Sequence, residues 1–251
     1  MKKSRLILLI VVVLTAVIYS CSDDNSPGGK SSNTGGNNNS GACAGGPTTV
    51  SDIDGNVYNV VSIGNQCWMK ENLKTTRFRN ATLITTGLNQ TQWCNTFSSA
   101  CSDFLNDTAN TRVYGKLYNY YAVADINGLC PYGWHVPTVA EWDSMSNYLG
   151  GYSIAGGKMK EIGLTHWASP NTGATNNSGF TGLPGGGRSS IYQIGVNNDY
   201  TGRDSFGYWW TSTLISGSLP KLISLDYDNN KLNGFYNADN QQGASVRCVR
   251  D

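Results

Sequence analysis

Charged residues are scarce in this sequence. Only 14% of its 251 residues are Asp, Glu, Lys or Arg, and the formal net charge is +1. Nucleic-acid binding depends on clustered lysine and arginine that neutralise phosphates, and this composition gives no sign of such a surface. We therefore expect no nucleic-acid partner.

Metal-ligating and catalytic motifs are also missing. The chain has two histidines, His135 and His166, and no Cys-x-x-Cys pair, so a zinc site built from histidine and cysteine is not expected. There is no Gly-x-Ser-x-Gly elbow, no His-Glu-x-x-His helix and no phosphate-binding loop. The sequence accordingly predicts no catalytic residues and no enzymatic activity.

No hydrophobic run is long enough to span a bilayer comfortably. The longest runs from Leu6 to Ile18, is interrupted only by Thr15, and follows a start with two lysines and one arginine. A membrane-spanning helix needs about 20 apolar residues. A shorter run behind a basic start is typical of a secretory signal peptide, which we place at residues 1–20.

The signal peptide ends at a cysteine. The stretch Ile18-Tyr19-Ser20-Cys21 resembles the bacterial lipobox, although Tyr19 is bulkier than the usual residue there. Processing after Ser20 would leave Cys21 as a lipidated N-terminus. Several acyl chains, at about 0.8 kcal/mol per buried methylene, would hold the chain on the membrane. The alternative is an uncleaved N-terminal anchor.

Two short stretches follow this cysteine. Ser22-Asp23-Asp24 resembles the surface-export signal of lipoproteins in the Bacteroidetes, although an acidic pair can also simply begin a solvated linker. With the lipid anchor, this signal predicts an outer-membrane lipoprotein that is exposed at the cell surface.

The residues up to Gly46 are almost all Gly, Ser, Asn, Thr and Pro, without the apolar periodicity that folding requires. We expect residues 21–46 to be a flexible tether and residues 47–251 to be one domain.

The chain has seven cysteines. If Cys21 carries lipid, six remain in an oxidising compartment, and an even number there predicts three disulfides. Six cysteines allow fifteen connectivities, and spacing leaves them open. The simplest arrangement pairs neighbours along the chain, as Cys43–Cys67, Cys94–Cys101 and Cys130–Cys248.

The start of the domain is typical of a β-hairpin. Residues 49–51 and 57–63 are strand-like and flank Asp54-Gly55, a pair that favours a type I′ turn. The same stretch resembles a calcium loop. It fails as an EF-hand, because its glycine is at the fourth position rather than the sixth and Ile63 stands where the bidentate glutamate should be.

Two main helices are expected. Residues 114–124 have apolar side chains at helical spacing. The second helix begins at Thr138-Val139-Ala140-Glu141, a capping-box sequence, and ends at Gly150-Gly151, where glycine accepts the left-handed conformation. Its expected apolar face consists of Trp142, Met145, Tyr148 and Leu149.

The remaining elements are shorter. Residues 80–111 show no clear period and are expected to form a surface insertion pinned by Cys94–Cys101. Strands separated by Asn- and Gly-rich turns are expected over residues 180–183, 208–213, 222–227, 232–236 and 245–249. The predicted class is α+β, with short mixed or antiparallel strands, two main helices and long loops.

Several motifs occur in the order typical of one family. They are Thr49-Val50-Ser51-Asp52-Ile53-Asp54-Gly55, Gln66-Cys67-Trp68-Met69-Lys70-Glu71-Asn72-Leu73, Gly128-Leu129-Cys130-Pro131-Tyr132-Gly133-Trp134-His135-Val136-Pro137-Thr138, Gly179-Phe180-Thr181-Gly182-Leu183-Pro184-Gly185-Gly186, Tyr208-Trp209-Trp210-Thr211-Ser212-Thr213 and Ser245-Val246-Arg247-Cys248-Val249-Arg250-Asp251. Over about residues 47–251 the chain resembles the Fibrobacter succinogenes major paralogous domain.

That family is similar in turn to the formylglycine-generating branch of the C-type-lectin-like fold. The resemblance implies a disulfide-braced C-type-lectin-like domain in which Cys130 is bridged to Cys248. Enzymes of that branch use a pair of reactive cysteines that bind copper. This chain departs from them, because the expected framework leaves no cysteine unpaired, and we do not expect their activity here.

A lipid anchor, a tether and a fold rich in loops together predict a non-catalytic binding module at the cell surface. Aromatic rings can stack on the apolar face of a sugar, while Asn, Asp and Arg bond its hydroxyl groups. The loops over residues 166–177 and 192–206 contain both kinds of side chain, although the same residue types are ordinary in loops. The candidate ligand-binding residues are His166, Trp167, Tyr192, Asn197, Asn198, Asp199, Tyr200 and Arg203.

The expected partner is an extracellular glycan. The alternative is a structural or adhesin role in the cell envelope, with a protein as the ligand. No cofactor is expected, with calcium left open because folds of this type often hold it through Asn and Asp side chains and backbone carbonyls.

Overall fold

The computed structural model describes residues 41–191, 199–214 and 219–251. The predicted signal peptide, Cys21 and most of the predicted tether lie outside these ranges. Within them, no helix has both the length and the apolar character needed to cross a membrane.

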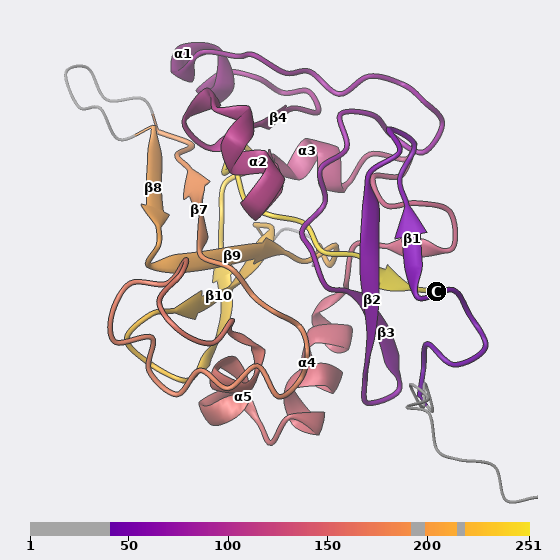
Figure 1. Cartoon of the computed structure of the whole chain (residues 1–251). Coiled ribbons are helices and arrows are strands. Elements are labelled where there is room, and N and C mark those ends of the chain that lie inside the picture. Colours follow the sequence, from indigo (N-terminus) through magenta and orange to yellow (C-terminus); the bar gives the residue numbers. More distant parts are fainter. Residues whose placement is uncertain (1–40, 192–198, 215–218) are drawn as a thin grey trace, which may run out of the picture. The chain divides into compact units, whose positions relative to one another are not determined.

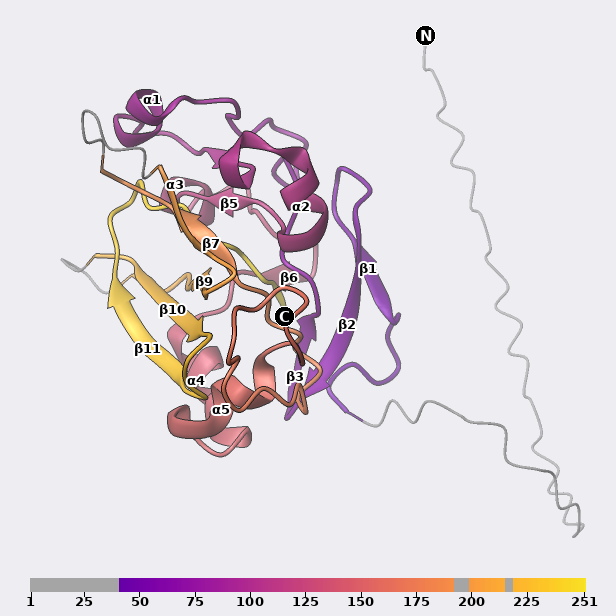
Figure 2. The ribbon, with the colours of Figure 1, turned by 60° about the vertical axis from the view of Figure 1, so that its left-hand side comes forward.

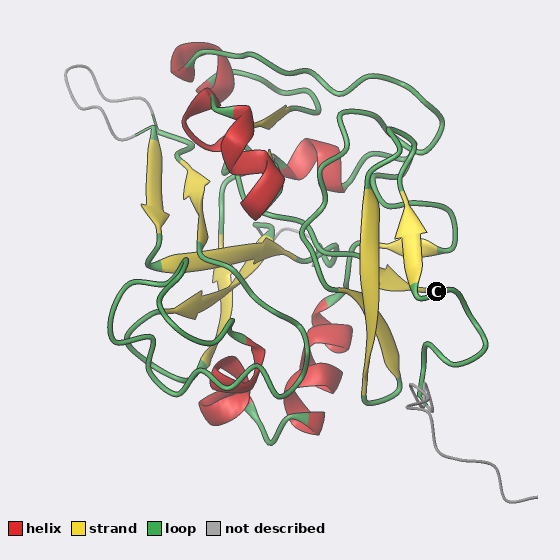
Figure 3. Ribbon diagram, viewed as in Figure 1, coloured by secondary structure: helices red, strands yellow, loops and turns green. Residues whose placement is uncertain are grey.

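The described residues form two five-stranded sheets and a short two-stranded one (Figure 1 and Figure 3). The first sheet is antiparallel, in the order β1 (Thr49–Ser51), β2 (Val57–Ile63), β3 (Gln66–Met69), β12 (Val249–Arg250) and β6 (Trp134–His135). The second has the order β11 (Leu232–Asn237), β10 (Lys221–Asp226), β9 (Phe206–Trp210), β7 (Gly185–Arg188) and β8 (Tyr200–Arg203). Only β7 and β9 pair in parallel there. The short sheet joins β4 (Cys101–Ser102) to β5 (Leu117–Tyr118).

The helices lie at opposite ends of these sheets (Figure 1 and Figure 2). At one end are α1 (Gln90–Cys94), the 3-10 helix η1 (Phe104–Asn106), α2 (Thr108–Tyr114) and α3 (Tyr120–Val123). At the other are α4 (Val139–Tyr148) and α5 (Tyr152–Met159). The α+β class, weighted to strands, is thus confirmed.

The predicted hairpin is confirmed, with a longer loop than a two-residue turn. Strands β1 and β2 pair from Thr49↔Asn59 to Ser51↔Val57. Asp52 closes the loop: its Oδ1 accepts the backbone N–H groups of Asp54 and Asn56 at 3.0 and 2.9 Å. Its Oδ2 accepts the Tyr58 hydroxyl at 2.5 Å. The Asp52 carboxylate therefore stabilises the turn through these hydrogen bonds, as expected for a hairpin.

The predicted capping-box helix is also confirmed. In α4 the Thr138 side chain accepts the Glu141 backbone N–H, while the Glu141 carboxylate accepts the Thr138 N–H at 2.7 Å. Gly150 and Gly151 end the helix region with φ of 100° and 95°. One residue of the expected apolar face is misplaced, because Tyr148 is 67% exposed.

Three predictions from periodicity are wrong. Residues 114–124 form β5 and the four-residue α3 instead of one helix, since Leu117 and Tyr118 pair with β4. Residues 180–183 form no strand, and β7 begins at Gly185, where three successive glycines carry no hydrophobic pattern. Residues 80–111 are not a surface insertion pinned by a disulfide, because Cys94 and Cys101 are free, Trp93 is fully buried and Phe104 nearly so.

Tryptophans dominate the core. Trp68, Trp142 and Trp209 belong to a cluster between α4 and the two large sheets, in which the rings of Trp68 and Trp142 lie 4.8 Å apart. Phe180 contacts all three of these indoles at centroid distances between 5.7 and 6.1 Å. Trp210 belongs to the second core cluster and is also fully buried. Both tryptophans of the Tyr208-Trp209-Trp210 motif therefore pack inside the domain.

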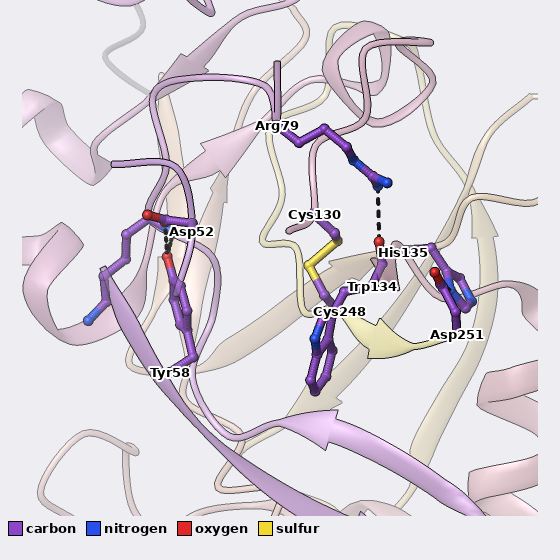
Figure 4. The surroundings of a disulfide bond; sticks show 9 residues. Asp52, Tyr58, Arg79, Cys130, Trp134, His135, Cys248 and Asp251 are labelled. Carbon is purple, nitrogen blue, oxygen red and sulfur yellow. Dashed lines mark hydrogen bonds and ion pairs between the residues drawn. A yellow bond between two sulfur atoms is a disulfide. The ribbon is translucent and has the colours of Figure 1, made fainter. Parts of the chain in front are cut away.

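Two of the expected disulfides are present. Cys43 is bonded to Cys67 on β3. Cys130 is bonded to Cys248 immediately before β12, and Figure 4 shows this second bond. The second bond, which the family resemblance implies, closes a separation of 118 residues. It ties the segment before β6 to the final strand.

The third expected disulfide is absent, and Cys94 and Cys101 are free thiols. Their surroundings explain why. Cys94 ends α1, where the Gln90 amide nitrogen lies 3.3 Å from its sulfur. Cys101 is on β4 with 0% exposure, inside the core cluster. Nearness in sequence did not bring the two side chains together.

The ordered domain begins earlier than residue 47. Cys43 is 1% exposed and donates its backbone N–H to the Ser62 hydroxyl at 2.9 Å. Arg250 reaches back to donate to the Ala42 carbonyl. The last residues assigned to the tether therefore pack on the first sheet.

Candidate functional site

The predicted ligand-binding residues do not gather into one site. Tyr192, Asn197 and Asn198 lie outside the described residues. The other five divide between the surroundings of Trp167 and the strand β8.

Trp167 is a core residue, and its assignment to ligand contact is wrong. It is 2% exposed, and its indole N–H donates to the Gly182 carbonyl at 3.0 Å. The Lys160 ammonium lies 5.4 Å from the ring centre. Neighbouring His166 is half-buried, with Nδ1 at 2.8 Å from the Glu161 carboxylate and its ring at 5.7 Å from that of Tyr114.

Tyr200 and Arg203 are occupied by contacts within the domain. The Tyr200 ring lies 5.2 Å from Phe104, and its hydroxyl donates to Asn106 Oδ1 at 3.1 Å. Arg203 donates to Asn110 Oδ1 at 3.1 Å. These bonds attach β8 to η1 and α2. Asp199 contributes its backbone carbonyl, which accepts the Ser189 N–H at 2.8 Å.

The face of the second sheet opposite Trp209 is only partly buried and carries a better candidate. On β9 and β10 the cross-strand neighbours are Phe206↔Asp226 and Tyr208↔Ser224, while Tyr236 on β11 lies opposite Leu222. Side chains alternate between the two faces of a strand, so these residues share one face. Trp209, Ile223 and Leu225 point from the other face into the core.

These side chains line two adjoining pockets that share Tyr208 and Tyr236, which we call the sheet-face groove. One pocket, of about 360 Å³, is lined by Phe206, Tyr208, Ser224, Asp226 and Tyr236. The other, of about 370 Å³, is lined by Ser190, Ile191, Tyr208, Leu222, Tyr236, Asn237, Ala238, Asp239 and Gln242. Strands β10 and β11 lie at the edge of the domain in Figure 2.

The groove combines aromatic rings with fixed polar groups. The planes of Phe206 and Tyr208 are inclined by only 18°, with centroids 5.8 Å apart. The Asp226 carboxylate accepts the Ser224 hydroxyl at 2.8 Å. Burial raises the pKa of Tyr208 to about 12, and the charges of Asp226 and Tyr236 add to this. The Tyr208 phenol therefore stays protonated near neutral pH and can donate a hydrogen bond.

The end of β10 beside the groove is held by a buried ammonium. Lys160 is 0% exposed and donates to the backbone carbonyls of Thr172, Asp226 and Asn229 at 2.7 to 2.9 Å. Burial lowers its pKa to about 8, despite the neighbouring Asp226 and Asp228. The position of Asp226 is thus set by the interior of the domain.

A separate cavity of about 530 Å³ lies between the helices and β11. Its walls include Tyr152 and Phe235, whose rings meet edge to face at 6.2 Å, and Leu232 at the start of β11. The Tyr152 hydroxyl donates to Asp143, and burial with this carboxylate raises the pKa of Tyr152. The surface that lines this cavity is largely apolar.

The chemistry available to the described residues is limited. They contain no group of three or more His, Cys, Asp or Glu side chains placed to hold a metal ion. Burial raises the pKa of Cys94 above its ordinary value and that of Cys101 to about 12. Both thiols are therefore protonated near neutral pH, whereas thiol nucleophiles and metal ligands react as thiolates.

Sequence reasoning missed the groove, although a signal was present. Phe206-Gly207-Tyr208-Trp209 alternates, and one set of alternate residues on a half-buried strand faces out. The strand was predicted at residues 208–213 rather than Phe206–Trp210, so Phe206 fell outside it and the aromatic pair was not predicted to share a face.

Comparison with known proteins gives one result. Neither the curated proteins nor the solved structures include a match. The family described as the Fibrobacter succinogenes major domain matches residues 61–250, from the middle of β2 to the end of β12. That match spans most of the chain, and the chain belongs to the Fibrobacter succinogenes major domain family.

Proposed function

We propose that this protein is an outer-membrane lipoprotein that displays a non-catalytic glycan-binding domain at the cell surface. The anchor is supported by the basic start, the short apolar run and Ser20-Cys21. The tether is supported by the polar composition up to residue 40. Cys21 would carry the lipid.

We assign the domain to the C-type-lectin-like fold. In support, α4 and α5 pack beside one antiparallel and one mixed sheet, long loops join the later strands, and Cys130–Cys248 links the segment before α4 to the last strand. Such a scaffold presents a ligand surface without moving its core.

The sheet-face groove carries the functional proposal. Two pockets of about 360 and 370 Å³ each fall within the range of small-molecule sites, and they meet at Tyr208 and Tyr236. A shape of this kind suits an extended ligand with repeating units, such as an oligosaccharide. The rings offer apolar surface to sugar C–H groups, and the polar side chains bond hydroxyl groups.

The domain acts by binding, without chemistry. The two free thiols are held protonated by burial, and Asp226 is already engaged by Ser224 and, at 3.3 Å, by Asn229. A glycan would be held and released unchanged.

Binding of the full-length chain, in detergent, to an array of polysaccharides and glycans tests the proposal. We expect binding to at least one class, lost or weakened about tenfold in Tyr208→Ala and Tyr236→Ala. Tyr148→Ala is the matched control, because Tyr148 is 67% exposed and lies on α4 rather than in the groove. No binding across the array, or equal binding by all three variants, would reject the groove as a glycan site.

Two additions to this experiment test its other parts. Repeating it with a chelator shows whether calcium takes part. Labelling with a fatty-acid analogue should mark the wild-type chain and leave Cys21→Ser unlabelled and released from the membrane. A labelled Cys21→Ser chain would contradict lipidation at that cysteine.

A further inference from the structure

A buried arginine lies beneath a small pocket that shares no lining residue with the groove. Arg247, two residues before β12, is 1% exposed and stacks on Phe180 with its guanidinium 4.0 Å from the ring centre. Its Nε and Nη2 donate to Asn72 Oδ1 at 3.0 and 2.6 Å, and its Nη1 donates to the Phe180 carbonyl. All these acceptors are neutral.

The positive charge of Arg247 is therefore uncompensated at close range. Among the described residues, Arg247 forms no ion pair with a carboxylate. The other fully buried arginine there, Arg188, also forms no ion pair. Removing a guanidinium from water is unfavourable unless a counter-charge or hydrogen bonds offset the lost hydration. Three hydrogen bonds use only part of the five N–H groups of a guanidinium. Burial lowers the pKa of Arg247 to about 9, and only Glu71 counters this.

Arg247 also lines a small pocket. A pocket of about 170 Å³ is lined by Arg247 together with Lys70, Glu71, Asn72, Val113, Thr181 and Leu183. These residues come from four separate segments, which meet only in the folded domain. Asn72 cannot turn toward a ligand, because its oxygen also accepts the Trp209 indole N–H at 2.8 Å.

The charges around this pocket favour an anion. Lys70 and Arg247 contribute two positive charges against the single carboxylate of Glu71. Both Glu71 oxygens are already occupied, since they accept the backbone and side-chain N–H groups of Asn59 at 2.8 Å each. The volume is below that of a pocket that encloses a drug-sized molecule, about 300 Å³, so it suits one small group.

We propose that this Arg247 pocket binds a carboxylate group. The planar guanidinium matches a carboxylate in shape and charge, and a buried ion pair of this kind is strengthened by its low-dielectric surroundings. The carboxylate could belong to a free small acid or to an acidic sugar residue. The proposal stands apart from the sheet-face groove, because the two sites share no residue.

The Trp209 indole N–H provides a local probe, since it shares the Asn72 acceptor with Arg247. We would follow its NMR signal in the full-length chain, in detergent, while adding acetate, glucuronate or acetamide at constant ionic strength set with chloride. We expect a saturable shift with acetate, with glucuronate or with both, and none with neutral acetamide. Acetate alone would identify a free acid as the ligand, and glucuronate alone an acidic sugar.

Two variants avoid disturbing the buried arginine. Val113 is 43% exposed on α2, so Val113→Trp should fill the pocket and abolish the shift, and Lys70→Gln should weaken binding about three- to tenfold. Val57→Trp, at a 59% exposed position on β2 outside the pocket, is the matched control and should behave as wild type. An absent shift, an equal response to acetamide, or unchanged binding in Val113→Trp would each overturn the proposal. None of these results would affect the glycan test.

Discussion

Phe206 and Tyr208 stand two positions apart on β9, with ring planes inclined by 18° and centroids 5.8 Å apart, and both side chains are partly exposed. Parallel rings at this spacing can contact successive units of one ligand. If they do, their contributions to binding should be coupled.

A double-mutant cycle on Phe206→Ala and Tyr208→Ala measures this coupling. We expect each single variant to lose about 1.4 kcal/mol of glycan binding free energy, or roughly tenfold in affinity, and the double variant to lose a non-additive amount. Isothermal titration with a glycan identified on the array gives the values. Strictly additive losses would place the two rings in separate contacts.

Trp167 should matter for stability and not for recognition. Trp167→Ala removes a fully buried indole and leaves the Gly182 carbonyl without the hydrogen bond that the indole N–H donates to it. We expect a loss of about 3–5 kcal/mol in the free energy of unfolding. Denaturant unfolding measures it, with the exposed Tyr148→Ala as a control that should change by less than about 0.5 kcal/mol. A small loss in Trp167→Ala would show that the indole is less constrained than its burial indicates.

Thiol counting tests the two free cysteines. Under denaturing conditions we expect peptide mapping to find Cys94 and Cys101 unpaired, with four other cysteines in two disulfides. In the folded chain Cys94 should react first and slowly, because it is half-buried with a raised pKa, while Cys101 is protected by complete burial. Recovery of a Cys94–Cys101 peptide from the native protein would contradict this arrangement.

The two disulfides should differ in their contribution to stability. Chain-entropy arguments give about 4–5 kcal/mol for the Cys130–Cys248 loop of 118 residues and about 3–4 kcal/mol for the Cys43–Cys67 loop of 24. Paired Cys→Ser variants of each bridge, compared by denaturant unfolding, should show the larger loss for the long loop. A larger loss for Cys43–Cys67 would mean that the start of the domain depends on its covalent link more than loop length suggests.

The pH dependence of the free energy of unfolding should reflect the protonation of His135. Burial alone would lower its pKa, but hydrogen bonds and charges from Asp251 and Glu141, at 2.5 and 2.7 Å, outweigh this and raise it above 6.5. A raised pKa means that the folded state binds the proton more tightly. The stabilisation is therefore complete below about pH 6.5 and is lost as the pH rises through the folded-state value.

His135→Gln should remove this fall in stability, and Asp251→Asn should reduce it, because Glu141 still faces the ring. The effect should be about 1 kcal/mol or less, since the pair is partly exposed. Thermal unfolding measured from pH 5.5 to 8.5 tests it. A wild-type stability that rises across this range would contradict the raised pKa.

The sequence alone determined the features that depend on neighbours along the chain. The Thr138–Glu141 capping box, the glycine pair that ends α4 and the hairpin around Asp54-Gly55 are local, because each is built from backbone groups within a few residues. The ordered motifs also sufficed for the family, which the match over residues 61–250 confirms. They implied the Cys130–Cys248 bond across 118 residues as well, whereas spacing left all fifteen connectivities of the six cysteines open.

The tertiary structure decided which side chains are buried, which are exposed and which lie next to one another across distant segments. Cys94 and Cys101 are close in sequence but belong to different surroundings, and Trp167 lies on a loop in sequence yet inside the core. Tyr208 and Trp209 are adjacent aromatics, and only the pairing of β9 with β10 turns one outward to the groove and the other inward to Asn72. Arg247 lies under a pocket that is lined by four segments distant in sequence. No pattern of neighbouring residues could have predicted that these segments come together.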